Sequence, residues 1–223
     1  YYQYYTTFFM WGVEYLGWDI FMMAAMMDPQ GFKEKFLDPA FDASLANIEE
    51  LCKAECPFVF LHDDLADARG PIFPPSWYDR FILPRYPKLF APVKRAGKKV
   101  IFVADGNMRH FLRPLRELGV DGVMFENPAT DFSLILEYFH DRFIIGGADT
   151  QVLTFGEPAA ITKHVEEIAE CTKGIPGFAL SSPGGLHGNI PLKNLEAYFD
   201  ARVEAGFTPQ NWRADVHHSS LYP

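Results

Sequence analysis

The chain has few of the features that define several common classes of protein. It has only three cysteines in 223 residues, an odd number that favours no disulfide framework, so we expect a reducing, cytoplasmic location. Its 29 acidic residues outnumber its 20 lysines and arginines, which argues against binding to nucleic acid or to an anionic membrane. Its apolar run IFMMAAMM (20–27) is far shorter than the ~20 residues that a membrane-spanning helix needs.

Three further motifs are absent. The glycine pairs at 146–147 and 184–185 lack the G-x-G-x-x-G spacing, so we expect no dinucleotide site. Cys52 and Cys56 have no further ligands within reach in the sequence, so we expect packed thiols and not a metal site. No initiating methionine is present, because the first residue is tyrosine, and we expect that the start of the natural chain is missing.

Five short apolar runs are present from residue 56 onward, and each one ends in polar residues. They are CPFVFLHDD (56–64), GKKVIFVADGN (97–107), VDGVMFEN (120–127), RFIIGGADT (142–150) and GFALSSPGG (177–185). Apolar runs without alternation are typical of strands that are buried on both faces, as in parallel sheets.

Helical patterns separate these runs. They cover residues 74–97, where Ser76 and Asp79 are spaced as a capping box, and residues 108–119, 157–174 and 191–206. Alternating strands and helices predict an α/β protein, either a doubly wound sheet or a (β/α)8 TIM barrel. The first 40 residues look helical and aromatic, so a barrel of eight units would lack its N-terminal strands. With no visible linker, we expect a single domain over residues 1–223.

Carboxylates follow several of the predicted strands. Asp105, Glu126 and Asp149 are separated by 20 and 22 residues, about one strand–helix unit each, so they should be neighbours on one rim of a barrel. Because barrel enzymes keep their chemistry at this end of the strands, we predict that these three residues are catalytic. Any one of them could instead cap a helix. On the same rim we predict five substrate-binding residues: His62, Asp63, Asp64, Asn107 and Asn127.

Two kinds of chemistry fit such a rim. Carboxylates close together raise one another's pKa, so they can act as general acid and base. Carboxylates with an imidazole can also hold a divalent cation. Both readings stay open at this point.

The sequence also resembles the uroporphyrinogen decarboxylase superfamily over about residues 56–206. The matching segments are the Asp63-Asp64 pair with its glycine-containing loop, PPSWYDRFILPRY, the strand ending ADGN, ELGVDGVMFEN and GGADTQVLTFGEPAAI. Within the superfamily the sequence is most similar to the corrinoid-dependent methyltransferases and the O-demethylase methyltransferases. This resemblance implies a (β/α)8 barrel with its substrate at the mouth, a corrinoid (cobalamin) carried by a partner protein, and zinc.

The resemblance also bears on the metal ligands. The thiol-activating branch has a His-x-Cys pair where this chain has Val103 and Asp105, and a later cysteine near Ser182. Since those thiols are absent, the resemblance implies zinc bound by nitrogen and oxygen, with Asp105, Glu126 and His187 as the candidate ligands.

From these features we expect a methyltransferase that moves a methyl group from a small methoxylated, aromatic substrate to a corrinoid protein. The alternatives are a decarboxylase of a tetrapyrrole or a related acid, and a non-catalytic barrel that binds a corrinoid or tetrapyrrole. Bound metal would separate the first two, and turnover would separate an enzyme from a binder. Whether the protein forms a homodimer stays open.

Overall fold

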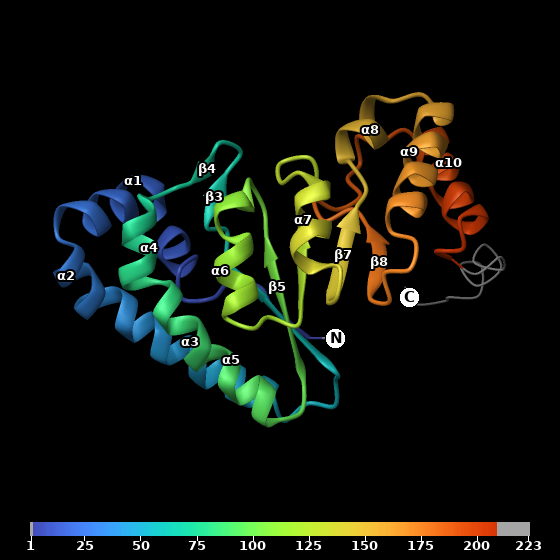
Figure 1. Ribbon diagram of the computed structural model, residues 1–223. Coiled ribbons are helices and arrows are strands. Elements are labelled where there is room, and N and C mark those ends of the chain that lie inside the picture. Colours follow the sequence, from blue (N-terminus) through green and yellow to red (C-terminus); the bar gives the residue numbers. More distant parts are fainter. Residues whose placement is uncertain (1, 209–223) are drawn as a thin grey trace, which may run out of the picture.

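The structure is a computed structural model that describes residues 2–208. Six strands form one sheet in which all neighbours are parallel (Figure 1). In spatial order they are β1 (Tyr2–Tyr4), β2 (Phe58–His62), β5 (Lys99–Ala104), β6 (Gly122–Phe125), β7 (Phe143–Gly147) and β8 (Phe178–Ser181).

The order of the strands in space follows their order along the chain, with no reversal. A doubly wound sheet reverses at a switch point, whereas a TIM barrel adds each strand beside the previous one. The α/β class and the barrel-like winding are therefore confirmed. Within residues 2–208 the sheet has six strands, and its outer strands, β1 and β8, do not pair to close it.

Helices cover one face of the sheet (Figure 1). The hairpin strands β3 (Ala66–Asp67) and β4 (Gly70–Pro71) lie at the end toward which the arrows of β5 and β7 point. The helices are α1 (Trp11–Met27), α2 (Pro29–Phe32), η1 (Lys33–Leu37), α3 (Asp38–Leu51), α4 (Pro75–Phe81), η2 (Leu83–Arg85), α5 (Tyr86–Arg95), η3 (Met108–His110), α6 (Leu112–Glu117), α7 (Phe132–Phe139), α8 (Thr150–Phe155), α9 (Pro158–Cys171) and α10 (Leu192–Glu204).

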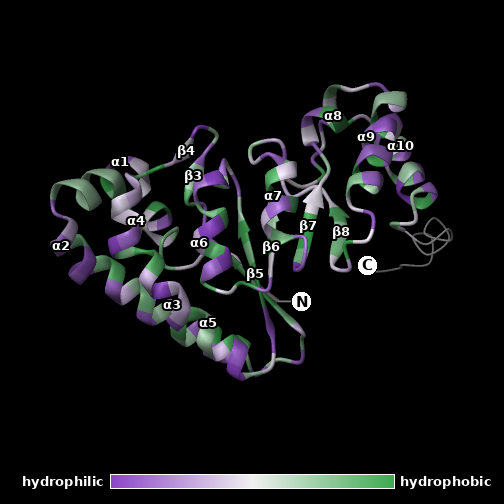
Figure 2. Cartoon of the chain, viewed as in Figure 1, coloured by the Kyte–Doolittle hydropathy of each residue, from purple (hydrophilic) through white to green (hydrophobic). Residues whose placement is uncertain are grey.

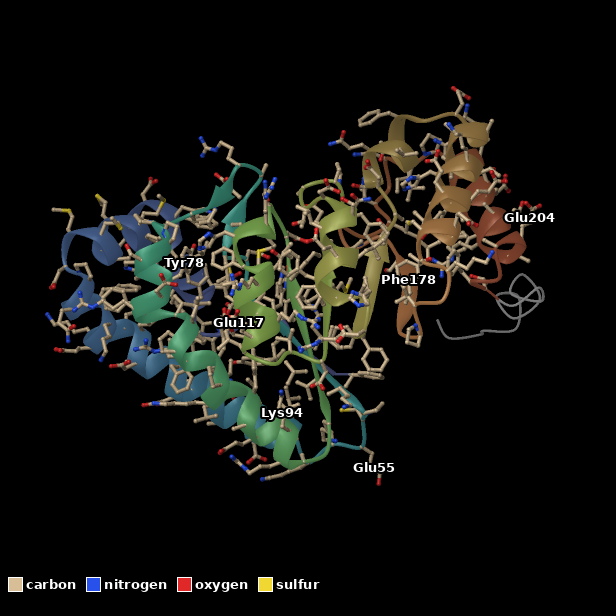
Figure 3. The ribbon with its side chains drawn as sticks, in the orientation of Figure 1. Glu55, Tyr78, Lys94, Glu117, Phe178 and Glu204 are labelled. Carbon is tan, nitrogen blue, oxygen red and sulfur yellow. The ribbon has the colours of Figure 1, made fainter. Side chains whose placement is uncertain are left out.

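The two faces of the sheet are both apolar, as the uninterrupted runs predicted. On β2, Val59 and Leu61 belong to the large core under the helices, while Phe60 clusters with Ile101 and Val103 on the other face. This second face borders a cavity of about 560 Å³. Figure 2 shows the hydrophobic colouring along β5 and β8, and Figure 3 shows charged side chains such as Glu55 and Glu204 pointing away from the protein.

The helix boundaries show which local signals operate. Pro84 lies in η2, which separates α4 from α5, as expected where prolines interrupt a helix. Gly119 follows α6 with φ +82°, the left-handed conformation that glycine tolerates at a helix end. The predicted capping box is wrong: α4 begins at Pro75, so Ser76 lies inside its first turn and no side chain caps that end.

Three features of the fold differ from the sequence-based expectation: β1, α7 and the β3–β4 hairpin. The first 40 residues are mostly helical, but they begin with β1, which adds a sixth strand beside β2. Neither α7 nor the β3–β4 hairpin was predicted. Among the described residues, no helix is both long enough and apolar enough to cross a membrane.

Candidate active site

Three titratable side chains meet where β2 and β5 end. His62, Asp64 and Asp105 each offer a ligand atom, and these atoms lie within 4.8 Å of one another. His62 and Asp105 belong to the face of the sheet that carries Phe60 and Val103, because every second residue of a strand points the same way. The register pairs His62 with Val103, so Asp105 lies two residues further along the chain, just after the end of β5.

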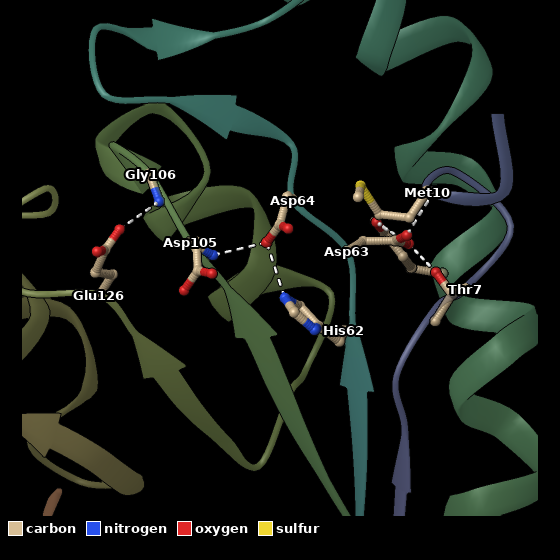
Figure 4. A network of polar contacts seen from close by, with 9 residues as sticks. Thr7, Met10, His62, Asp63, Asp64, Asp105, Gly106 and Glu126 are labelled. Atoms are coloured by element: carbon tan, nitrogen blue, oxygen red, sulfur yellow. Dashed lines mark hydrogen bonds and ion pairs between the residues drawn. The ribbon is translucent and has the colours of Figure 1, made fainter. Parts of the chain in front are cut away.

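Asp64 joins the other two residues (Figure 4). Its Oδ1 lies 2.9 Å from His62 Nε2 and accepts a hydrogen bond of 2.8 Å from the backbone N–H of Asp105. Burial raises the pKa of Asp64, but these two interactions outweigh it and the pKa is lowered. Burial lowers the pKa of His62, but the hydrogen bond and charge of Asp64 outweigh it, so this pKa is raised. The two shifts favour an imidazolium–carboxylate pair.

The pKa of Asp105 shifts in the opposite direction from that of Asp64. Burial, together with the negative charges of Asp64 and Glu126, raises the pKa of Asp105 to about 6, and the positive charge of His62 opposes this shift. A carboxyl group with such a pKa can hold a proton near neutral pH and release it to a substrate. The chemistry that the arrangement supports is proton donation next to a fixed ion pair.

The turn after Asp105 is held rigidly. Gly106 has φ +80°, and a Cβ atom there would lie 2.4 Å from the backbone oxygen of Ala66 in the hairpin. The buried Thr130 hydroxyl donates to the oxygen of Gly106 and accepts from the N–H of Met108, both at 2.8 Å. Glu126 Oε2 accepts a weak hydrogen bond of 3.4 Å from Gly106 N–H (Figure 4). These contacts fix the position of Asp105 relative to Glu126.

The carboxylates open into a cavity of about 660 Å³. Asp64, Asp105 and Glu126 line one part of it, and the hairpin segment 66–72 lines another. Trp18 and Met22 of α1 complete the lining. The cavity therefore combines a strongly acidic part with an apolar part, as small-molecule sites commonly do.

Asp63 does not fit its predicted role in substrate binding. Its side chain is fully buried and points away from Asp64, toward the segment that precedes α1 (Figure 4). It accepts hydrogen bonds from Met10 N–H at 3.1 Å and the Tyr86 hydroxyl at 3.0 Å, and also from the Thr7 hydroxyl. The physical reason is the alternation of an extended chain, which turns adjacent residues to opposite faces. Asp63 is a structural anchor.

Three other predicted residues serve local structure. Asp149 Oδ1 accepts from Gln151 N–H at 2.7 Å and caps α8, and Asn107 caps η3 in the same way. Asn127 donates to the backbone oxygen of Gly147 at 2.8 Å and so ties the end of β6 to β7. These contacts are what asparagine and aspartate make at strand exits.

His187 does not join the group that contains Asp105. It is exposed on the loop after β8, where its Nε2 lies 3.4 Å from the Thr154 hydroxyl. Among the described residues, the group with ligand spacing is His62, Asp64 and Asp105, which shares Asp105 with the predicted set of Asp105, Glu126 and His187. Sequence reasoning had assigned His62 to substrate binding only.

Thr130, Trp18 and Met22 were missed altogether. Thr130 is 25 residues from Asp105, and no local pattern links them. Trp18 and Met22 lie in a stretch that also packs the core through Phe21.

Comparison with known proteins identifies the family and the fold of the chain. A family model described as Uroporphyrinogen decarboxylase (URO-D) matches residues 10–205. The chain belongs to this family. The resemblance noted in the sequence is thereby confirmed at the level of the superfamily, and it extends further toward the N-terminus than residue 56.

A solved structure with the same fold is a methyltransferase from Methanosarcina mazei, with a TM-score of 0.65 and 18% sequence identity. The match covers 89% of this chain but 56% of the methyltransferase chain, so this URO-D family chain spans little more than half of that protein. At this identity the likeness establishes the fold. No curated protein matches the chain.

Proposed function

We propose that this URO-D family chain carries the active site of a methyltransferase, which takes a methyl group from a small methoxylated aromatic substrate and passes it to a corrinoid protein. The observation that carries the proposal is the position of Asp105, a carboxyl group with a pKa of about 6 in a cavity beside the His62–Asp64 pair. The structural likeness to a methyltransferase supports the reaction class.

The chemistry of an aryl methyl ether explains why such an acid is needed. When the carbon–oxygen bond breaks, both bonding electrons stay on the oxygen, which must be protonated or otherwise stabilised. Asp105 donates that proton, and the nearby charge of Glu126 helps Asp105 to keep it until the substrate is bound, because this charge raises the pKa of Asp105. The reduced corrinoid of the partner would supply the nucleophile for the methyl carbon, so the chain needs no nucleophile of its own.

Zinc is the alternative means of stabilising the departing oxygen. The nitrogen and oxygen donors of His62, Asp64 and Asp105 fit a divalent ion, and their atoms are close enough to share one. An ion there would act as a Lewis acid toward the oxygen.

The two routes, proton donation by Asp105 and Lewis-acid catalysis by zinc, differ in whether methyl transfer requires a metal ion. Purified protein is stripped with a chelator, and single-turnover methyl transfer from 2-methoxyphenol to a reduced corrinoid protein is measured with and without Zn²⁺. Activity that survives the stripping supports Asp105 as the acid. Activity that returns only with Zn²⁺, together with Zn²⁺ binding that His62→Gln abolishes in calorimetry, supports the metal route. No transfer under any condition contradicts the proposed function.

The charges in the cavity disfavour decarboxylation of a tetrapyrrole. Such a substrate carries several carboxylates, which Asp64, Asp105 and Glu126 would repel. Arg69 is the single cation among the described lining residues, and Asp67 already pairs with it at 2.8 Å. A non-catalytic corrinoid-binding barrel would bind corrinoid without turnover in the same assay. The cytoplasmic location and the homodimer remain predictions.

A further inference from the structure

The helix α1 changes direction at Gly17, where the backbone is not helical (φ 70°, ψ 163°). After this kink, Phe21 and Ala25 are fully buried and attach the helix to the core. Trp18 and Met22 lie on the same part of the helix but are 44% and 40% exposed, and both line the cavity that contains Asp105. The kink therefore brings two large apolar side chains to the acidic cavity.

The packing of α1 does not depend on these two residues. Phe21 contacts Phe9, Phe32 and Phe73 through ring pairs with centroid distances of 5.3–5.6 Å. The Trp18 ring has one such neighbour among the described residues, Phe21, at 6.5 Å. With 44% of its surface exposed, Trp18 has a large area available to a ligand.

We propose that Trp18 and Met22 form the wall that selects the substrate, a flat aromatic ring whose methoxy group reaches Asp105. This inference rests on the proposed function. A tryptophan face binds an aromatic ring by offset or edge contacts, and a methionine sulfur adds favourable contacts to the ring. The methoxy group is uncharged, so it can approach Asp64, Asp105 and Glu126 without the repulsion that an anionic group would meet.

The ring of the substrate stacks on Trp18, while Met22 adapts to substituents. Asp67 and Arg69 in the hairpin form an ion pair with no net charge at the edge of the cavity. The wall therefore favours neutral aromatic ethers over aliphatic ethers of similar size.

The test measures ligand binding in the full chain without a corrinoid protein. 2-Methoxyphenol is titrated by calorimetry into the wild type and into Trp18→Ala, Trp18→Phe and Met22→Ala. We expect Trp18→Ala to weaken binding by at least roughly tenfold, Met22→Ala to weaken it less, and Trp18→Phe to restore it to within about threefold of the wild type. Ile20→Ala is the matched control, because Ile20 is exposed on the same helix and does not line the cavity; we expect no change.

Methyl transfer gives an independent measurement. With a corrinoid protein present, Trp18→Ala should raise KM for 2-methoxyphenol and leave kcat within about threefold, since stacking on the ring stabilises the bound substrate and the transition state equally. Wild-type affinity in Trp18→Ala overturns the inference even if methyl transfer occurs. Binding of 2-methoxyphenol that depends on Trp18, without any transfer, supports the wall and contradicts only the proposed function. A wild type that binds choline or dimethoxyethane but not 2-methoxyphenol overturns the inference.

Discussion

Asp63 and Asp64 are adjacent in the sequence, yet they lie in two different environments. Asp63 faces the helices, where it is fully buried and accepts hydrogen bonds from Met10 and Tyr86. Asp64 faces the cavity, where it joins His62 to the backbone of Asp105. The side chain of Asp63 holds the N-terminal segment against the sheet, and that of Asp64 organises a site.

The electrostatics of the two environments also differ. Burial raises the pKa of Asp63 to about 8, although Met10 N–H and the Tyr86 hydroxyl oppose the shift. The pKa of Asp64 is lowered in spite of its burial, because His62 and the Asp105 backbone stabilise its charge. Two adjacent acidic residues at a strand end can therefore have different roles, one structural and one in the candidate site. The face of the sheet toward which each side chain points decides its role.

The largest expected effect is on the cavity side. Asp105→Asn removes the proton donor but keeps the shape of the side chain, so methyl transfer should fall by at least ~100-fold. Its thermal midpoint should stay close to that of the wild type, because the Asp105 backbone contact with Asp64 remains. Single-turnover transfer and thermal unfolding measure the two quantities. Glu126→Gln, which removes a charge that raises the pKa of Asp105, should reduce the rate less; wild-type rates in both variants would remove Asp105 from the site.

On the buried side, Asp63→Ala should affect stability more than activity. The change leaves the hydroxyl groups of Thr7 and Tyr86 and the N–H of Met10 without their acceptor, which costs roughly 2–4 kcal/mol in the free energy of unfolding. Urea denaturation measures this cost. Asp67→Ala is a suitable control, since that carboxylate lies on the partly exposed hairpin. Equal losses of stability in the two variants would contradict the anchoring role of Asp63.

The pH dependence of stability offers a finer comparison. A group whose pKa is raised on folding stabilises the protein below its unfolded pKa, and this contribution is lost as the pH rises through the folded pKa. For Asp63 that interval runs from about 4 to about 8. The thermal midpoint of the wild type should therefore decrease as the pH rises from 5 to 8.5. Asp63→Asn should flatten this fall; a slope equal to that of the wild type would show that other groups cause it.

The smallest expected effect concerns Asp149, which the sequence grouped with Asp105. Because its carboxylate caps α8, Asp149→Asn should keep a capping oxygen and cost less than ~1 kcal/mol in stability. Methyl transfer should stay within about threefold of the wild type. A loss of rate comparable to that of Asp105→Asn would return Asp149 to the catalytic group.

Much of the fold could be predicted from the sequence, because buried parallel strands require continuous apolar runs and the helices between them carry their own end signals. All five predicted strands form, in the predicted parallel arrangement. The short strand β1 escaped prediction because its three residues, YQY, have no apolar run, and pairing with Val59, Phe60 and Leu61 alone makes them a strand. No pattern in the local sequence predicts that pairing.

The sequence by itself determined that polar residues follow the strands, and hence that His62, Asp64, Asp105 and Glu126 would lie at one end of the sheet. Only the tertiary structure decided which of them share a cavity. Strand alternation directs the side chain of Asp63 away from the cavity, and Asp149 caps a helix. The fold places His62 close to Asp105, whereas His187 lies on an exposed loop. The fold also placed Trp18, which is 87 residues from Asp105 in the sequence, in the lining of the same cavity. Such contacts depend on how elements pack in three dimensions, a property that the spacing of residues along the chain does not encode.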